Sequence, residues 1–269
     1  MECFLNTRSD NMPGEKIIYI VSWLKEQLKK ANCRGFVVGV SGGIDSAVTS
    51  TLAAMTSYPV ALVTLPINQD SDQLERARKH IDDLKDRFTN VKSFEVDLTT
   101  ASTTLLASLP KEASSELAVV NLKSRIRMTT LYAFANSNDF LVVGTGNKVE
   151  DYGVGFFTKY GDGGVDLCPI ADLLKSEVRA LAALLQVSNE IQSAVPTDGL
   201  WGDNRSDEEQ IGATYEELEW AMEFCSNSED RATLTRRQRE VLEIYKFRHV
   251  NAKHKLQAPP VCMIPDGFR

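Results

Sequence analysis

The sequence "SGGIDS", which begins at Ser41, has residue types and a spacing that suit phosphate chemistry. Gly42 and Gly43 allow a tight turn and leave backbone N–H groups uncovered, and such groups form concave sites for anions. The hydroxyls of Ser41 and Ser46 add donors where a helix is expected to begin, and the start of a helix attracts negative charge. A lone pair of glycines would more simply indicate an ordinary turn, but the full pattern predicts an anion-binding loop.

The loop lacks the lysine that nucleotide-binding loops normally use to reach the terminal phosphates. Asp45 stands at the corresponding place, and its carboxylate would repel a bare phosphate. A magnesium ion between this carboxylate and the phosphate oxygens removes the conflict, because Mg²⁺ is commonly bound by carboxylates together with substrate phosphates. The residues therefore predict that the loop holds a phosphate group together with Mg²⁺.

Two further segments are rich in glycine and in polar side chains. The first, residues 146–164, reads "GNKVEDYGVGFFTKYGDGG", and the second covers residues 195–206. The first is too irregular for a regular element, and the second has the same character. We expect both to be functional loops, because binding and catalytic groups concentrate on loops that a rigid scaffold holds in place.

The elements that must position these segments alternate between helices and strands. Helical spacing of apolar residues predicts helices, and short apolar runs predict buried strands. The expected strands cover residues 36–40, 60–65, 91–98 and 140–145, and the expected helices cover residues 15–30, 47–57, 70–87, 117–136, 175–185, 214–225 and 235–250. This alternation predicts an α/β fold in which a Rossmann-like parallel sheet has helices on both faces. Ligands of such folds gather at the carboxyl ends of the strands, where the loop at Ser41 lies.

Composition and charge exclude several classes of protein. The 269 residues suit one large α/β domain, residues 1–269, and show no internal repeat. The net charge is −7 and no basic run stands out, so a nucleic-acid partner is not expected. The five cysteines are scattered without a Cys-x-x-Cys pair, which argues against zinc or redox sites and indicates reduced thiols. No signal peptide or membrane span is evident, so we expect a cytoplasmic location without membrane contact.

The loop at Ser41 resembles the pyrophosphate-binding loop of the ATP pyrophosphatase group, whose members cleave ATP between the α and β phosphates. Within that group, the chain is similar to the NAD synthetase family in the ordered stretches "LKSRIRM", "GTGNKVE", "GFFTKYGDGGVD", "LLKSEV", "VPTDGLWGDNRSDEEQIGATYEELE" and "KHKLQAP". The stretch "FFTKYGDGG" is the most discriminating, because an enzyme of the group with another substrate would share only the first loop. The resemblance implies an adenine nucleotide α-hydrolase-like sheet and the amidation of deamido-NAD by ammonia. By the same resemblance, ATP would be converted to AMP and pyrophosphate through an adenylated intermediate.

The resemblance also implies roles for individual residues. The positions matched to ATP contacts are Gly39, Val40, Ser41, Gly42, Gly43, Ile44, Asp45, Ser46, Thr145, Lys175 and Thr197. Those matched to deamido-NAD contacts are Arg125, Lys159, Asp166, His254 and Lys255. Asp45 and Glu150 match the ligands of Mg²⁺, and Asp162 matches the place where ammonia is received, so the implied catalytic residues are Asp45 and Asp162. Lys175 would supply the positive charge that the first loop lacks. The implied partners are deamido-NAD, ATP and ammonia, the implied cofactor is Mg²⁺, and the implied assembly is a homodimer.

The chain departs from the family pattern at two places. The stretch "EDYGVGFF" is longer than the family spacing by a residue, so Asp151 competes with Glu150 as the metal ligand. Thr64 occupies a place that bears an ATP-contacting arginine in some relatives, and Gln69 or Asp70 could take over that contact. Taken singly, the matched lysines would more often be solvated surface residues, so the assignments depend on the pattern as a whole.

The nitrogen source and the reaction class have alternatives. The family-like stretches occupy the chain from Gly39 to Pro259, so no glutamine-splitting amidase domain is expected and free ammonia is the predicted donor. The "GTGN" stretch resembles the version common in glutamine-using relatives, which keeps a separate glutaminase as an alternative. Two other functions use such a loop, a tRNA-modifying enzyme and a catalytically inert nucleotide-binding regulator. The lack of basic patches and paired thiols argues against the first, and the retention of both metal-binding acids and Asp162 argues against the second.

Overall fold

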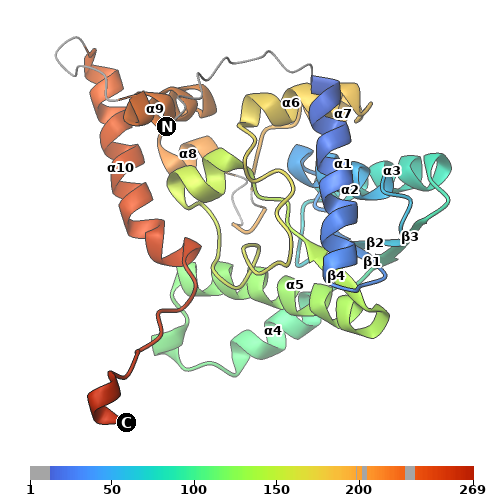
Figure 1. Ribbon diagram of the computed structural model, residues 1–269, viewed down its shortest axis with the longest axis horizontal. Coiled ribbons are helices and arrows are strands. Elements are labelled where there is room, and N and C mark those ends of the chain that lie inside the picture. Colours follow the sequence, from blue (N-terminus) through green and yellow to red (C-terminus); the bar gives the residue numbers. More distant parts are fainter. Residues whose placement is uncertain (1–12, 198, 202–204, 228–233) are drawn as a thin grey trace.

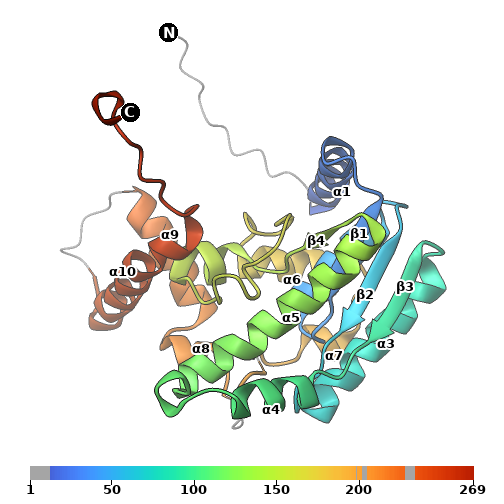
Figure 2. The same ribbon diagram turned by 90° about the horizontal axis from the view of Figure 1, so that it is seen from below.

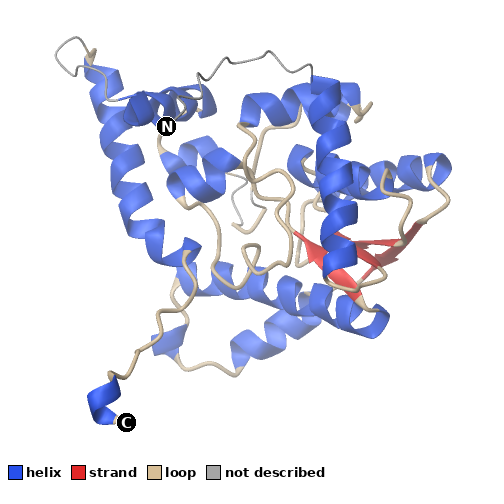
Figure 3. Ribbon diagram, viewed as in Figure 1, coloured by secondary structure: helices blue, strands red, loops and turns tan. Residues whose placement is uncertain are grey.

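A four-stranded parallel sheet lies at the centre of the computed structural model, which describes residues 13–197, 199–201, 205–227 and 234–269. The strands are β1 (Gly35–Gly39), β2 (Val60–Thr64), β3 (Val91–Glu95) and β4 (Phe140–Val143). Their order across the sheet is β3-β2-β1-β4 (Figure 2), and every neighbouring pair runs parallel. The strands are red in Figure 3. The chain builds the sheet in one direction from β1 and then returns to the other side of β1, which creates a topological switch point between β1 and β4.

Alternating side chains of the strands build an apolar core on each face of the sheet. Phe36 and Val38 of β1 belong to one core, and Val37 belongs to the other. The first core is covered by α1 (Pro13–Lys30), α2 (Ile44–Ala54), α3 (Ser71–Arg87), α6 (Lys175–Leu184) and the short α7 (Asn189–Gln192). The second is covered by α5 (Glu116–Asn138), which lies over β1 and β4, while α4 (Thr99–Ala107) packs against α5 (Figure 2). Parallel strands need such cover because both of their faces are apolar.

A further apolar cluster, made of helical segments, lies beside the sheet (Figure 1). It is formed by η2 (Lys148–Val154), α8 (Asp207–Ile211), α9 (Tyr215–Asn227) and α10 (Arg236–Leu256). Its buried members include Val149, Leu218 and Leu242. Short 3-10 turns are present at η1 (Lys111–Ala113) and η4 (Asp266–Phe268). Because η2 follows β4 with only a short connection, this helical cluster is anchored at the carboxyl edge of the sheet.

The fold class predicted from the sequence is confirmed by the parallel sheet with helices on both faces. The expected strands and long helices are present with shifted ends: the third strand stops at Glu95, and the last long helix continues to Leu256. Helix α4, with the sequence "TTASTTLLA", was not expected because its threonines hide any helical spacing of apolar residues. No described helix is long and apolar enough to cross a membrane.

Residues 148–154 form a π-helix, so the prediction of an irregular loop is wrong for this part of the chain. Asn147 caps its start, because the side-chain oxygen accepts hydrogen bonds from the N–H groups of Val149 and Glu150, both at 3.0 Å. Gly155 ends it with a left-handed backbone (φ 61°), and a side chain there would collide with Ala252 of α10. A π-turn contains more residues than an α-turn, so this conformation would accommodate the additional residue that the sequence predicts in "EDYGVGFF".

Candidate active site

A cavity of about 560 Å³ lies at the carboxyl ends of β1 and β4, at the switch point of the sheet. Its wall includes every residue of 39–46, together with Thr145, Lys175 and Thr197. Glu150 and Asp151 of η2, and Asp162 in the following turn, line the same space. One cavity thus brings together all positions matched to ATP, both candidate metal ligands and the acid matched to ammonia.

Hydrogen bonds within the loop between β1 and α2 fix its shape. Ser46 Oγ donates to the Gly43 carbonyl oxygen at 2.9 Å and accepts from the Ser41 N–H at 3.2 Å. Gly42 has a left-handed backbone (φ 85°), and an added Cβ would come within 2.2 Å of the Gln73 carbonyl oxygen on α3. Helix α2 starts without a side-chain cap at Gly43. The N–H groups of its first turn are therefore available to an anion.

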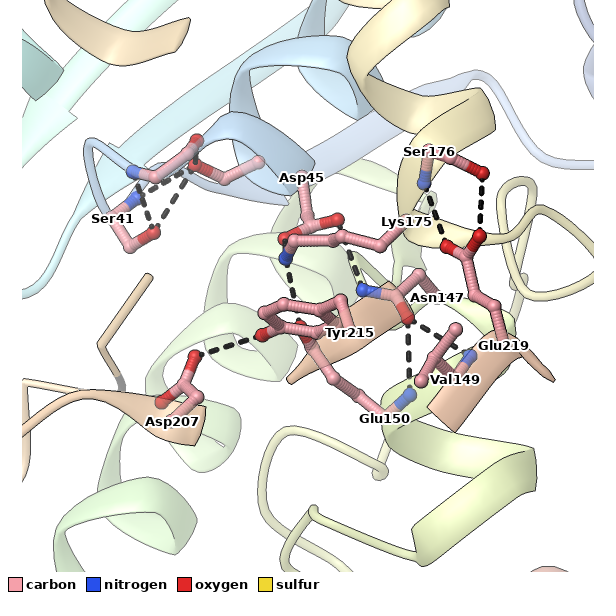
Figure 4. Close-up of polar contacts among 12 residues, drawn as sticks. Ser41, Asp45, Asn147, Val149, Glu150, Lys175, Ser176, Asp207, Tyr215 and Glu219 are labelled. Atoms are coloured by element: carbon pink, nitrogen blue, oxygen red, sulfur yellow. Dashed lines mark hydrogen bonds and ion pairs between the residues drawn. The ribbon is translucent and has the colours of Figure 1, made fainter. Parts of the chain in front are cut away.

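Lys175 lies at the centre of a buried ion cluster (Figure 4). Its side chain is only 2% exposed, and its Nζ lies 2.6 Å from Asp45 Oδ2 and 2.8 Å from Glu150 Oε1. Asn147 donates to the other oxygen of Asp45 at 3.1 Å, and the Tyr215 hydroxyl donates to Glu150 Oε1 at 2.6 Å. Residues from α2, η2, α6 and α9 thus converge on a single cation position.

The charges of this cluster do not balance, because one ammonium faces two carboxylates. Burial raises the pKa of Asp45 despite the attraction of Lys175. Burial acts in the same direction on Glu150, but the charge and hydrogen bond of Lys175 outweigh it and lower the pKa of Glu150. For Lys175, burial favours a lower pKa, and the attraction of the two carboxylates outweighs burial and raises it. The lysine therefore stays charged, and the two carboxylates can accept further positive charge.

The donor set suits a hard divalent cation that brings other ligands with it. Among the described residues, no group of three or more His, Cys, Asp or Glu side chains is placed to hold a metal ion. Asp45 and Glu150 offer two carboxylates that converge on the ammonium of Lys175, which uses one oxygen of each. Mg²⁺ usually takes one or two carboxylates and completes its shell with substrate phosphates and water. The site therefore fits Mg²⁺ that arrives with a nucleotide better than a metal held by protein ligands alone.

The neighbouring acids Glu150 and Asp151 make different contacts. Glu150 contacts the same ammonium as Asp45. Asp151 packs against the backbone of Gly146 instead, since a Cβ atom placed on that glycine would lie only 1.8 Å from Asp151 Oδ2. Burial, followed by the charges of Asp162, Glu150 and Asp45, raises the pKa of Asp151 well above its usual value. Glu150 is thus the better-placed partner of Asp45, and Asp151 lies nearer to the influence of Asp162.

Asp162 is held in the turn after η2 by two donors that use the same oxygen. Ser124 Oγ of α5 donates to Asp162 Oδ1 at 2.6 Å, and the Thr158 N–H donates to it at 3.0 Å. No hydrogen bond to Oδ2 is formed within the described part of the chain. Asp162 keeps accessible surface because it lines the cavity, yet the surrounding protein raises the pKa of its carboxyl by desolvation. Its second oxygen can therefore accept a hydrogen bond from a small ligand such as ammonium.

The sequence model of the NAD synthase family matches residues 16–259 of the chain. The chain belongs to the NAD synthase family. It is 39% identical over 209 residues to the NH₃-dependent NAD⁺ synthetase of Mesoplasma florum, covering 76% of this chain and 82% of that protein. It is 36% identical over 254 residues to the NH₃-dependent NAD⁺ synthetase of Carboxydothermus hydrogenoformans, covering 93% and 98%. The resemblance inferred from the ordered motifs is thereby confirmed.

Solved structures with the same fold include one with a different product in its name. The structure of NMN synthetase from Francisella tularensis is 31% identical to this chain, with a TM-score of 0.82, and covers 96% of this chain and 100% of that one. The structure of an NH₃-dependent NAD synthetase from Campylobacter jejuni, in complex with the nitrate ion, has a TM-score of 0.76 and 23% identity. It covers 93% of this chain and 99% of that one, and it shows the shared fold.

In this member of the NAD synthase family, the positions matched to deamido-NAD are divided between the cavity and the surface. Lys255 lines the cavity, and its Nζ donates to the carbonyl oxygens of Gly155 and Phe157 at 2.8 and 2.7 Å. Burial lowers the pKa of Lys255. The remaining matched positions are not part of the cavity wall, and they are Arg125, Lys159, Asp166 and His254.

Three of these outer residues form a chain of contacts at the surface. Lys159 Nζ donates to the His254 carbonyl oxygen at 2.6 Å, and Arg125 donates to the Lys159 carbonyl oxygen at 3.3 Å. Asp166 lies elsewhere, because its Oδ2 accepts from the Val142 N–H of β4 at 2.8 Å. The structure therefore groups Arg125, Lys159 and His254 beside one another and keeps Asp166 at the edge of the sheet. Their roles in dinucleotide binding stay predictions.

Thr64 is buried and does not contribute to the cavity wall. Its hydroxyl donates to Glu95 Oε2 at 3.3 Å, and Arg78 of α3 donates to both oxygens of the same carboxylate, at 2.8 and 2.6 Å. Of the two residues considered as replacements for the arginine of relatives, Gln69 lines the cavity, whereas Asp70 caps the start of α3. Gln69 is therefore the better placed of the two.

Tyr215 and Asn147 contribute to the site although the sequence motifs give them no role. The Tyr215 ring centroid lies 4.8 Å from Lys175 Nζ, and its hydroxyl oxygen, whose proton is directed to Glu150, also lies 3.3 Å from Asp207 Oδ2. Tyr215 is 1% exposed, so its apolar helical spacing correctly marks a core residue but hides the polar contact of its hydroxyl. The one available signal is that both residues lie inside family-like stretches, "GTGNKVE" and "GATYEELE".

Proposed function

We propose that the chain is an amide-forming ligase that converts deamido-NAD, ATP and ammonia into NAD, AMP and pyrophosphate. The observation that carries this proposal is the single cavity lined by the loop 41–46, the Lys175 ion cluster and Asp162. The family match and the two relatives named NH₃-dependent NAD⁺ synthetases support the same reaction. The residues of the cavity divide between two half-reactions.

The first half-reaction transfers AMP to the nicotinate carboxylate of deamido-NAD. A carboxylate is a poor electrophile, so one of its oxygens attacks the α phosphate and the bond from that phosphorus to the bridging oxygen of the β phosphate breaks. Pyrophosphate leaves into the loop, where the first-turn N–H groups of α2 and the hydroxyl of Ser41 are able to receive it. Lys175 fixes Asp45 and Glu150 beside this loop.

Mg²⁺ is the proposed cofactor, with Asp45 and Glu150 as its ligands from the protein. Two convergent carboxylates, with no third acidic, histidine or cysteine ligand grouped with them in the described part of the chain, match the way in which Mg²⁺ binds with a nucleotide. When bound, the ion offsets the negative charge of the phosphates. The remaining contribution of the protein is to hold the two carboxylates in place through Lys175, Asn147 and Tyr215.

The second half-reaction is assigned to Asp162. Its carboxylate holds ammonium through the second oxygen and accepts a proton, so that neutral ammonia attacks the carbonyl carbon of the adenylate and AMP leaves. A raised pKa makes Asp162 a better proton acceptor than an ordinary aspartate. Ser124 and Thr158 orient the carboxyl by holding its other oxygen.

A mononucleotide acid is a second candidate substrate for the same chemistry. The similarity to the NMN synthetase of Francisella tularensis, at 31% identity over nearly the full length of both chains, favours testing it. Most of the positions matched to the dinucleotide also lie outside the cavity wall. A nicotinate mononucleotide would need fewer of those outer contacts than deamido-NAD.

The proposal is tested by measuring all products formed by the purified chain. We expect AMP, pyrophosphate and NAD in equal amounts, and only when ATP, Mg²⁺, deamido-NAD and ammonium are present together. Production of ADP and phosphate would exclude attack at the α phosphate, and turnover with glutamine alone would exclude free ammonia as the donor. Nicotinate mononucleotide is supplied in a parallel reaction, and turnover with it but not with deamido-NAD would reassign the substrate.

A homodimer is the proposed assembly. The C-terminal segment stands away from the body of the chain and carries large exposed apolar side chains (Figure 2), which are Val261, Met263, Ile264 and Phe268. Exposed apolar groups gathered in this way are typical of an interaction surface. Light scattering of the purified chain should give twice the mass of one chain, and a monomer would contradict the proposal. The cytoplasmic location and the lack of nucleic-acid and membrane partners stay predictions.

A further inference from the structure

The pyrophosphate loop has a charge deficit that Lys175 does not remove. Lys175 is buried and binds both Asp45 and Glu150, so its charge is already shared between two carboxylates. It also lies at the Asp45 end of the loop, beside the start of α2. The triphosphate of ATP carries about four negative charges, of which one Mg²⁺ ion would offset two, and N–H groups are weaker partners for the remainder than a cation is. A second cation near the Gly42 end of the loop would complete the site.

Arg76 of α3 is the cavity-lining cation that contacts this end of the loop. Its Nε donates to the Gly42 carbonyl oxygen at 3.5 Å, which is a long hydrogen bond. The approach is forced by packing, because an added Cβ on Gly42 would lie 2.2 Å from the Gln73 carbonyl oxygen and 3.2 Å from the Ala77 nitrogen. Within the part of the chain that the structure describes, Arg76 forms no ion pair. The N–H groups of its guanidinium other than Nε–H are therefore available to a ligand.

Lys175 aside, the other described cations in the cavity wall form hydrogen bonds to residues outside the loop 41–46. Arg127 donates to the Leu65 carbonyl oxygen at 2.9 Å, and Arg248 donates to the Gln210 carbonyl oxygen at 2.5 Å. Lys255 donates to two carbonyl oxygens near the end of η2. Apart from Lys175, which binds Asp45, Arg76 is the one cation of the described cavity wall with a hydrogen bond to a residue of the phosphate loop.

A second pocket, of about 370 Å³, lies beside the loop, and Arg76 is one of its lining residues. It shares with the main cavity the residues Gln69, Gln73, Arg76, Thr197 and Trp201. Two acids also line it. Asp70 uses its Oδ1 to cap α3, accepting from two N–H groups, and Asp72 is exposed to solvent. The pocket is therefore a polar extension of the ATP site on the side of the loop that faces α3.

We infer that Arg76 binds the β and γ phosphates of ATP and the departing pyrophosphate, in the pocket between the loop 41–46 and α3. This inference rests on the proposed function, because it assigns a ligand within the same site. A planar guanidinium offers paired N–H donors that match phosphate oxygens, and it remains charged at every working pH. Arg76 thus takes the part that lysine plays in common phosphate loops, from a helix outside the loop.

The test compares the binding of pyrophosphate with the binding of AMP, which lacks the β and γ phosphates. Arg76→Gln removes the charge, Arg76→Lys keeps it without the guanidinium fork, and Lys79→Gln is the control. Lys79 lies on the same helix, is exposed, and pairs with Glu190 on the surface, so the control loses equal charge away from the cavity. Dissociation constants for both ligands are measured by calorimetry with Mg²⁺ present, and thermal unfolding of each variant is recorded.

Arg76→Gln should weaken pyrophosphate binding by about tenfold or more, with AMP binding unchanged. Arg76→Lys should recover part of that loss, and Lys79→Gln should bind both ligands like the wild type. If Arg76→Gln weakens the binding of AMP and of pyrophosphate equally, Arg76 only stabilises the loop and the inference is wrong. The inference is also wrong if Arg76→Gln binds pyrophosphate as the wild type does, or if the wild type does not bind pyrophosphate. Because these are binding measurements, they stand even if the product assay assigns a different acid substrate. Should Arg76→Gln fail to fold, the Arg76→Lys variant and its AMP control decide between the same outcomes.

Discussion

The two ends of the site are built in different ways. At the ATP end, Lys175 is buried and its charge meets two carboxylates that are themselves mostly enclosed, with side chains 17% and 15% exposed. At the end proposed to bind the dinucleotide, which we call the dinucleotide end, Arg125 and Lys159 lie toward the surface and donate to main-chain carbonyl oxygens. The first end is an ion cluster with a fixed geometry, and the second is a set of cations held by backbone contacts.

This difference affects how each end responds to change. An ion pair inside a protein is little screened, and removal of one partner leaves a buried charge uncompensated. A surface cation bound to a carbonyl oxygen loses much less when it is substituted. We therefore expect chemistry to depend steeply on the ATP end, and substrate affinity to depend more gently on the dinucleotide end.

Asp45→Asn is expected to produce the largest effect. The amide keeps the hydrogen-bonding shape but loses one negative charge, so the Mg²⁺–pyrophosphate unit loses a ligand that the proposed mechanism requires. Exchange of labelled pyrophosphate into ATP, with deamido-NAD present, should fall on the order of a thousandfold. The fold should be retained, because Lys175 and Glu150 are left as a balanced pair.

The exchange assay reports the first half-reaction by itself. Asp82→Asn on the exposed face of α3 removes the same charge far from the cavity and serves as the control. Near-normal exchange in Asp45→Asn would mean that the ATP end tolerates loss of its charge, and the distinction between the two ends would then fail.

The sequence motifs were sufficient to predict the sheet and the loop at Ser41, because local apolar runs and glycine spacing report them directly. They did not predict that Lys175 is buried, since a lysine at the start of a helix is normally solvated. Burial here depends on Asp45 and Glu150, which lie 130 and 25 residues away in sequence. Long-range ion pairing of this kind has no local periodicity, so single-sequence reasoning misses it.

The π-helix and Tyr215 show the same limit in another form. The sequence does not indicate the π-helix, because this helix depends on the Asn147 cap and on packing against α10. Tyr215 has the spacing of a core residue, and nothing local indicates that its hydroxyl reaches Glu150. The loop at Ser41 was predictable because its chemistry lies within six consecutive residues, whereas these contacts join separate segments.

Asp162→Asn should have a smaller and different effect. The oxygen that accepts from Ser124 and Thr158 is kept, so the turn should hold its shape. The lost charge removes the proposed acceptor for the ammonium proton, and NAD formation should fall by about a hundredfold. Pyrophosphate exchange should remain near the wild-type rate, and AMP should be released in excess over NAD as the adenylate hydrolyses. If pyrophosphate exchange falls as far as NAD formation does, Asp162 belongs to the ATP end, and its assignment to the second half-reaction is wrong.

Lys159→Gln should have the smallest of the three effects, because this lysine lies at the surface end of the site. Its Nζ donates to the His254 carbonyl oxygen at 2.6 Å and to the Gln257 carbonyl oxygen at 3.3 Å, and a glutamine amide can keep one such bond. What is lost is a positive charge for the phosphates of the dinucleotide. We expect the KM for deamido-NAD to rise by about tenfold, with kcat and the KM for ATP near their wild-type values.

A comparison of two acid substrates, deamido-NAD and nicotinate mononucleotide, makes the measurement on Lys159→Gln more specific. Nicotinate mononucleotide has one phosphate and no adenosine, so it extends less far from the cavity than deamido-NAD does. If Lys159 recognises the outer part of the dinucleotide, Lys159→Gln should raise the KM for deamido-NAD and leave that for nicotinate mononucleotide almost unchanged, while Lys79→Gln changes neither. A similar rise in KM for both acids would place Lys159 at the reacting half of the substrate. A fall in kcat with constant KM would show that the dinucleotide end contributes to the chemical step. Either result would remove the distinction between a rigid ATP end and a binding-only dinucleotide end.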